Sequence, residues 1–180
     1  MSLSAMHSPI IFLDFDGVLN SLRSCLVYGS YQRFDPISCG LVALLAANTD
    51  AKVVVSSSWR IGGDVPRLVD DLTQQGPEGE AIAERVVSMT PQLTGPRGAE
   101  IAAWLAEHAP GPEQPYVIID DDSDMLDGQL SRFVQTSHRD GFGVPEYHKA
   151  MSILSPEHKD SNDLSSLARW PSPHLQWEDA

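Results

Sequence analysis

The sequence predicts an α/β domain in which helices cover both faces of a parallel sheet. Three short apolar runs, at residues 10–13, 53–55 and 116–119, have the length and composition of strands buried on both faces. Segments with the apolar spacing of helices separate them, and this alternation is typical of the α/β class. Each run also ends in polar residues, and parallel strands end at one edge of their sheet. We therefore expect one site at that edge.

The first strand, residues 10–13, is followed by Asp14-Phe15-Asp16-Gly17. Because side chains alternate along a strand, Asp14 and Asp16 would face one side and Phe15 the other. Two carboxylates this close repel each other unless a cation joins them. Taken alone, the motif is equally typical of an ordinary Asp-Gly turn.

Four helices and two further strands are expected between and after these runs. Asp35-Pro36 and the pair Asp64 and Pro66 are typical helix starts, because Asp caps the first turn and Pro fits into it. Gly76 and Pro110-Gly111 are typical helix ends. The expected helices run from Pro36 to about Asn48, from Asp64 to Gly76, from Gly98 to His108 and from Pro145 to Leu154, and the further strands are residues 86–89, at an edge, and 133–136.

One domain is expected over residues 1–154, followed by a polar, proline-containing tail at residues 155–180. The 180 residues and their 42% hydrophobic share suffice for a single core. Trp104 lies on the apolar stripe of its helix and is expected in that core. We expect a cytoplasmic protein, because no apolar run approaches the roughly 18 to 20 residues of a membrane helix. The two cysteines, Cys25 and Cys39, are then expected as free thiols.

The second and third apolar runs end in residues that complete a site with the two aspartates. Ser56 follows the second run, and Asp120 and Asp121 follow the third. If the strands are parallel, at least four carboxylates and two or three hydroxyls meet at one edge. Such a cluster predicts a divalent cation, and Mg²⁺ prefers oxygen ligands of this kind. Zinc is disfavoured because the six His and two Cys show none of its ligand spacings.

These motifs resemble the haloacid dehalogenase-like (HAD) superfamily of phosphohydrolases. The family's first motif is matched from Asp14 to Val18, its second at Ser56 and its fourth at Asp120 and Asp121. The resemblance spans roughly residues 9 to 140. It implies a HAD-like fold, with a Rossmann-like parallel sheet and helices on both faces.

The third family motif is a Lys or Arg near the start of a later helix. None of the three lysines lies there. Arg97, in Pro96-Arg97-Gly98, occupies the right interval, and Arg60 is a rival for the same role.

A closer resemblance joins the chain to small, capless HAD domains grouped with RNA-repair proteins, and to the 3′-phosphatase half of polynucleotide kinases. It rests on residues 56–60, 90–105 and 118–125. The intervals between motifs are too short for a large cap domain, which implies an open site suited to a bulky substrate, or a lid from a partner subunit. Residues 22–34 are expected to form a flap beside the site. Tyr28 and Tyr31 in this flap are either stacking platforms for a base or ordinary loop aromatics.

The resemblance also implies the role of each site residue. Asp14 would attack phosphorus and form an aspartyl-phosphate, and Asp16 would act as general acid and base. Asp124 is a candidate to orient metal-bound water. Asp122 is explained at least as well as a solvated acid in the loop as by a role in the site. Phosphate would be held by Ser56, Ser57 and Arg97, with Arg60 as the alternative, and Mg²⁺ by Asp14, the Asp16 backbone carbonyl, Asp120 and Asp121.

The net charge of −13 limits the class of substrate. A protein that grips a duplex along its length needs a basic stripe, and none is visible. A nucleic-acid substrate would therefore be held at its end, or the substrate would be a smaller phosphate ester. The sequence leaves the oligomeric state open.

Taken together, the sequence predicts a Mg²⁺-dependent phosphomonoester hydrolase, acting on a nucleotide or on a terminal phosphate of a nucleic acid. Alternatives are a phosphatase of another small phosphate ester or of a phosphoprotein, and a non-catalytic phosphate-binding protein. The presence of both Asp14 and Asp16 favours an enzyme, and a dehalogenase has no need of Asp16. A mutase or phosphotransferase would have to shield the aspartyl-phosphate from water, which a capless chain does poorly.

Overall fold

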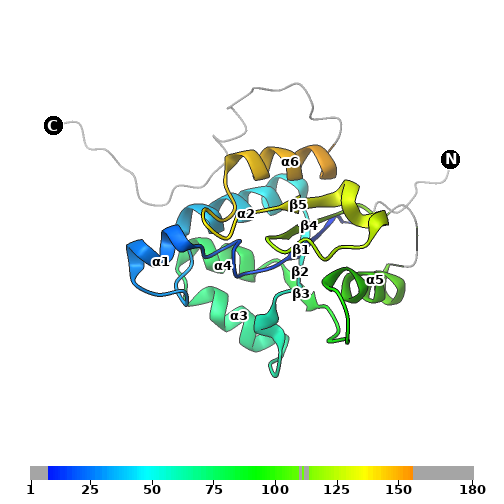
Figure 1. Ribbon diagram of the computed structural model, residues 1–180, viewed down its shortest axis with the longest axis horizontal. Coiled ribbons are helices and arrows are strands. Elements are labelled where there is room, and N and C mark those ends of the chain that lie inside the picture. The colour runs from blue at the N-terminus through cyan, green and yellow to red at the C-terminus, as the bar shows by residue number, and fades with distance from the viewer. Residues whose placement is uncertain (1–7, 110, 112–113, 156–180) are drawn as a thin grey trace.

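Five parallel strands form the centre of the computed structural model, which describes residues 8–109, 111 and 114–155 (Figure 1). The strand order is β3-β2-β1-β4-β5, and every pairing is parallel. The fold predicted from the sequence is therefore confirmed. The strands are β1 (Ile10–Leu13), β2 (Lys52–Val55), β3 (Val86–Met89), β4 (Tyr116–Asp120) and β5 (Phe133–Gln135).

The central strands owe their burial to the two hydrophobic layers that cover them. Ile11 and Leu13 of β1 face a large core cluster, whereas Phe12 faces a second cluster on the opposite side of the sheet. The alternation explains the unbroken apolar runs, since side chains on both faces of the sheet meet a packed layer. The edge strand β3 is only partly buried, as its predicted place implies.

Helices α2 (Pro36–Thr49) and α6 (Val144–Leu154) cover one face of the sheet, and α5 (Arg97–His108) covers the other (Figure 1). Asp35 caps α2 as predicted, its side chain accepting a hydrogen bond from the Ile37 amide (2.9 Å). Trp104 of α5 is buried against Phe12, with ring centroids 5.4 Å apart, so its expected core role is confirmed. Helices therefore cover both faces.

Two helices lie in an interval for which the sequence predicted only one. Between Arg60 and Arg97 the chain forms both α3 (Val65–Thr73) and α4 (Pro77–Ala83), not one helix. Gly76 is the N-cap of α4 and does not close α3, which ends with Gln74 as its C-cap. The short Pro77 helix gave no long apolar stripe to predict it.

The expected flap begins with a helix, α1 (Leu22–Tyr28). Ser21 and Ser24 form a reciprocal capping box at its start, and Gly29 ends it in the left-handed conformation (φ +73°). Most of its side chains are exposed, so the apolar periodicity that usually predicts a helix is weak here.

Among the described residues no segment forms a separate cap domain. Most of the predicted tail, residues 156–180, lies outside the described residues, as do residues 1–7, so the domain boundaries remain predictions. Cys25 and Cys39 are free thiols, as expected. None of the described helices is long and apolar enough to cross a membrane.

Candidate active site

The strand register places three polar residues in a row at the C-terminal edge of the sheet. Leu13 pairs with Val55 on one side and with Ile119 on the other. The next residue of each strand is therefore Ser56, Asp14 or Asp120, with Asp14 in the middle. The Asp14 amide donates to the Ile119 carbonyl (3.0 Å), which extends the ladder into this row. The predicted convergence of the strand ends is confirmed.

The row lies where the direction of the sheet changes. From β1 the chain proceeds to β2 and β3 on one side, and then crosses to β4 and β5 on the other. In open α/β sheets ligands bind outside the strand ends at such a switch point, because the loops there diverge and leave a crevice. Asp14 and Asp120 end the two strands that flank it.

Asp14, Asp120 and Asp121 form a carboxylate cluster, in which one oxygen of each lies within 4.8 Å of the others. Burial raises the pKa of Asp120 to about 8, and the nearby charge of Asp14 adds to this effect. Burial also raises the pKa values of Asp14 and Asp121. One Asp120 oxygen accepts from the Asp122 amide (3.0 Å), but Oδ2 is buried without a hydrogen-bond partner among the described residues.

An all-oxygen, anionic and partly buried group of this kind fits a hard divalent cation such as Mg²⁺. A cation would compensate the mutual repulsion of the three carboxylates and contact the unpartnered Asp120 oxygen. The side chain of Asp16, which the sequence placed with the same site, lies outside this group of three.

Gly17 brings the loop after Asp16 against the cluster. Its backbone adopts φ +71°, a conformation that favours glycine. A Cβ on Gly17 would lie only 2.3 Å from the Asp121 carboxyl carbon. The glycine of the first motif is thus needed for both conformation and close approach, and a larger residue would displace Asp121.

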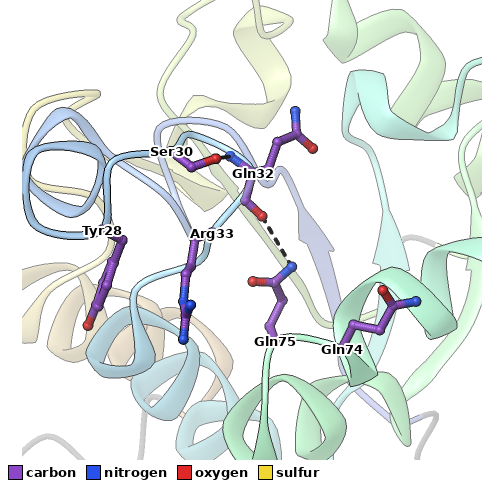
Figure 2. A pocket seen from close by; sticks show the side chains of 6 residues that line it. All are labelled: Tyr28, Ser30, Gln32, Arg33, Gln74 and Gln75. Carbon is purple, nitrogen blue, oxygen red and sulfur yellow. Dashed lines mark hydrogen bonds between the residues drawn. The ribbon is translucent and has the colours of Figure 1, made fainter.

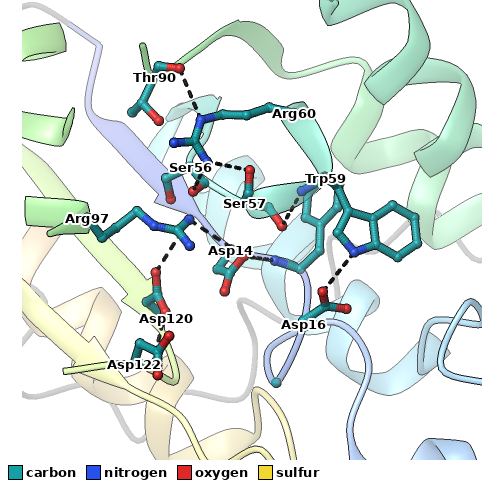
Figure 3. Close-up of polar contacts among 12 residues, drawn as sticks. Asp14, Asp16, Ser56, Ser57, Trp59, Arg60, Thr90, Arg97, Asp120 and Asp122 are labelled. Carbon is teal, nitrogen blue, oxygen red and sulfur yellow. Dashed lines mark hydrogen bonds and ion pairs between the residues drawn. The ribbon is translucent and has the colours of Figure 1, made fainter. Parts of the chain in front are cut away.

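Arg97 provides the positive charge beside the cluster. Its Nη1 atom lies 3.8 Å from Asp14 Oδ1 and 3.8 Å from Asp120 Oδ2 (Figure 3). The same Nη1 atom is buried and has no hydrogen-bond partner among the described residues. The charge of Arg97 opposes the effect of burial on the Asp14 pKa. Of the two arginines considered from the sequence, this one faces the carboxylates.

The first turn of α5 fixes the position of Arg97. Asp124 Oδ2 accepts a hydrogen bond from the Arg97 amide (2.8 Å), so this acid caps the helix. Gly98 packs so closely on the loop after β4 that an added Cβ would lie 2.5 Å from Gln129 Oε1. Asp124, for which the sequence suggested a role near metal-bound water, thus contacts the helix start, and Asp122 is exposed.

Arg60 is buried and occupied by structural partners. Its guanidinium donates to the carbonyls of Ser56 (2.9 Å), Ser57 (2.6 Å) and Thr90 (3.1 Å), and it pairs with Glu100. These contacts join the ends of β2 and β3 to α5. Glu100 also accepts from the Leu93 amide (3.0 Å). The role of this buried acid in supporting the site was not predicted from the sequence.

Two side chains hold the carboxylate of Asp16. Trp59 Nε1 donates to Oδ2 (2.9 Å), as Figure 3 shows. Asn20 Nδ2 donates to Oδ1 (2.7 Å). The Trp59 ring also packs against Phe15 and Phe34, at centroid distances of 5.7 and 5.2 Å. Neither role was predicted, although Trp59 lies within the motif at residues 56–60.

The two serines after β2 differ in their partners. Ser57 Oγ accepts from the Trp59 amide (3.4 Å), and the Ser57 side chain lowers the Asp14 pKa against the larger effect of burial. Ser56 Oγ is buried without a partner among the described residues, and so is Thr90 Oγ1 at the end of β3. Thr90 continues the row, since its amide donates to the Val55 carbonyl (3.0 Å). No role for Thr90 was predicted from the sequence.

No curated protein and no solved structure matches the chain. A family model does match it, over residues 10–146, a span that includes the whole carboxylate cluster and all of its neighbours described above. The model is described as the HAD domain in Swiss Army Knife RNA repair proteins. With the parallel sheet and the acidic row at its edge, this match shows that the chain belongs to that family of HAD domains.

Proposed function

We propose that this HAD domain, which its family makes a phosphatase-type hydrolase, is a Mg²⁺-dependent phosphomonoesterase that acts through an aspartyl-phosphate on Asp14. One observation carries the proposal. Among the described residues, five buried side-chain N or O atoms have no hydrogen-bond partner, and four of them belong to the row at the strand ends or to the arginine beside it. They belong to Ser56, Thr90, Arg97 and Asp120.

These four groups suit a phosphate and a cation. Buried polar atoms are nearly always hydrogen-bonded in folded proteins, so a local concentration of unpartnered ones calls for an explanation. Two hydroxyls and a guanidinium can donate to phosphoryl oxygens, whereas the Asp120 carboxylate can only accept or bind a cation. A phosphate monoester with Mg²⁺ would satisfy both kinds of group at once.

The first chemical step is an in-line attack by Asp14 on phosphorus. Asp14 Oδ1 accepts from the Phe15 amide (2.8 Å) and lies toward Arg97, which orients the other carboxylate oxygen for attack. The new Asp14 oxygen–phosphorus bond forms as the bond to the leaving oxygen breaks, and Asp16 donates a proton to that oxygen. Arg97 and the hydroxyls hold the phosphoryl oxygens, over which charge spreads in the transition state.

The second step releases Asp14. Asp16, now a carboxylate, takes a proton from a water molecule that attacks phosphorus, and inorganic phosphate leaves with the Asp14 carboxylate restored. Asp14, Asp120 and Asp121 would hold Mg²⁺, and the ion, when bound, supplies the positive charge that offsets repulsion between the phosphate and Asp14. The backbone carbonyl of Asp16 remains a further proposed ligand.

The proposed substrate is a terminal phosphate on a nucleotide or on a nucleic-acid strand. The family description names RNA repair, and the chain has no cap domain among its described residues to exclude a bulky molecule. The net charge of −13 argues against contacts along many phosphates, because such contacts need neutralising Lys and Arg. Recognition would then be confined to the end of the strand.

A substrate panel tests this function. We expect the purified protein to hydrolyse an aryl phosphate and phosphorylated oligonucleotides with Mg²⁺, and to lose at least about tenfold in rate in excess chelator. Full activity in chelator would disprove the metal dependence. If kcat/KM were tenfold higher for a sugar phosphate than for any nucleotide or oligonucleotide, about 1.4 kcal/mol in the barrier, the proposed substrate class would be wrong and the chemistry would stand.

Arg97→Ala and Arg60→Ala are expected to have different effects. Loss of Arg97 should lower kcat/KM by about 10²- to 10³-fold and weaken inhibition by inorganic phosphate, as for other transition-state donors. Loss of Arg60 removes the main partner of the buried Glu100 carboxylate, leaving only Arg97 Nε at 4.0 Å, and should cost about 3–5 kcal/mol of unfolding free energy. Chemical denaturation and phosphate inhibition, measured for both variants, separate the two effects. Weaker phosphate binding in the Arg60 variant than in the Arg97 variant would assign the cationic role to Arg60.

A further inference from the structure

A cavity lies between the segment around the end of α1 and the end of α3, with a volume of about 440 Å³ (Figure 2). This volume is within the roughly 300–1,000 Å³ of small-molecule sites. None of its lining residues is acidic, although the chain as a whole has a net charge of −13. The lining residues are Tyr28, Ser30, Gln32, Arg33, Gln74 and Gln75.

Tyr28 and Arg33 give the cavity one side with the chemistry of a base-binding site. The Arg33 guanidinium carbon lies 5.4 Å from the centroid of the Tyr28 ring, and Tyr28 is 41% exposed. Aromatic rings and guanidinium planes are the groups on which proteins stack unpaired bases. Arg33 also supplies a positive charge for a strand phosphate.

The backbone of the lining segment is held in place. Gln75 accepts from the Phe34 amide (2.9 Å) and donates to the Gln32 carbonyl (3.2 Å). Ser30 Oγ accepts from the Gln32 amide (3.0 Å). The hydrogen bonds drawn in Figure 2 involve neither the Arg33 guanidinium nor the Gln74 amide. The loop is thus fixed while these side chains remain available to bond the edge of a base.

One side chain connects this lining segment to the candidate active site. Asn20 Nδ2 donates to the Tyr31 carbonyl (2.7 Å), and it also donates to Asp16 Oδ1 (2.7 Å). The backbone at Tyr31, between Tyr28 and Arg33, is therefore connected through one side chain to the residue proposed as general acid. A substrate whose phosphate reaches Asp14 would extend its leaving group toward this side.

We propose that the cavity binds a nucleobase of the phosphorylated strand, stacked against Tyr28 and Arg33 and hydrogen-bonded at its edge by the Gln74 side chain. The inference rests on the proposed function, because it supplies the specificity of the same reaction. With a base bound in this cavity, the segment between α1 and α2 determines the specificity of the enzyme for single-stranded nucleic-acid ends.

The test uses Tyr28→Ala and Arg33→Ala, with Arg132→Ala as a matched control. The Arg132 guanidinium carbon lies 4.7 Å from the centroid of the Tyr116 ring, so the two residues form an equivalent Arg–Tyr pair. Tyr116 is the first residue of β4, which places this pair at the N-terminal ends of the strands, opposite the candidate active site. Loss of a stacking group should lower kcat/KM for a phosphorylated oligonucleotide by about tenfold. The aryl phosphate rate should stay within about twofold in all three variants, because that substrate has no base to place in the cavity.

Binding of a fluorescent, unphosphorylated oligonucleotide, measured by anisotropy, provides a readout that needs no activity. We expect the Tyr28 and Arg33 variants to bind it about tenfold more weakly than the wild type and the Arg132 control. Equal affinities in all four proteins, with equal oligonucleotide rates, would overturn the base-binding role. If the wild type hydrolyses neither substrate, the proposed function fails, and the anisotropy comparison still decides whether the cavity binds bases.

Discussion

Asp14→Asn is expected to lower kcat by about 10⁴-fold or more and to prevent phosphorylation of the protein by substrate. An amide nitrogen or oxygen is a far poorer nucleophile at phosphorus than a carboxylate. The replacement keeps the size of the side chain, so packing in the row between Ser56 and Asp120 is preserved. Acid-quenched samples of the wild type, incubated with labelled phosphate ester, should contain a protein-bound phosphoryl group that the variant lacks.

The same variant should fold at least as stably as the wild type in the absence of metal. Asp14 is buried and repels Asp120 and Asp121, so its removal relieves a like-charge cluster. Thermal unfolding in chelator measures this difference. Asp122→Asn is the matched control, because Asp122 is an exposed acid beside the cluster and its loss should leave kcat nearly unchanged. Near-normal turnover by the Asp14 variant would place the nucleophile elsewhere.

The sequence predicted the sheet and the row of polar residues because both depend on local signals. The apolar runs that precede Asp14, Ser56 and Asp120 determine where the strands lie in the sequence. Parallel pairing then brings the C-terminal ends of these strands together, independently of the conformation of the loops. The residues between those strands obey weaker local rules. Helices α1 and α4 are only seven residues long, too short to show a clear apolar periodicity, and such short helices depend on tertiary contacts for their stability.

The partners of Asp16 could not be predicted for a different reason. Trp59 is 43 residues away in the chain, and its contact with Asp16 depends on the 3₁₀ turn at Ser58–Arg60 and on packing against Phe34. The choice between Arg60 and Arg97 likewise depends on the packing of the α5 start against the loop after β4. Spacing along a sequence carries no information about such contacts between loops.

Asp16→Asn should lower kcat by about 10²- to 10⁴-fold on an alkyl or nucleotide phosphate, the usual contribution of a general acid and base. For an aryl phosphate, the rate of the first step should fall much less, because an aryloxide is a weak base and leaves without a proton. The comparison of the two substrates, with burst-phase kinetics to isolate the first step, separates proton donation from other effects. Equal losses of the first-step rate on both substrates would contradict a role for Asp16 as the acid.

Trp59→Phe extends this prediction to the group that orients Asp16. Phenylalanine retains aromatic contact with Phe15 and Phe34 but removes the Nε1–H donor, so we expect about a tenfold loss on the alkyl phosphate and a smaller one on the aryl phosphate. Trp104→Phe is the control, because Trp104 Nε1 donates to Ser88 Oγ (3.0 Å), away from Asp16. If Trp59→Phe lowered both rates equally, or Trp104→Phe produced the same substrate dependence, the Trp59 hydrogen bond would serve stability alone.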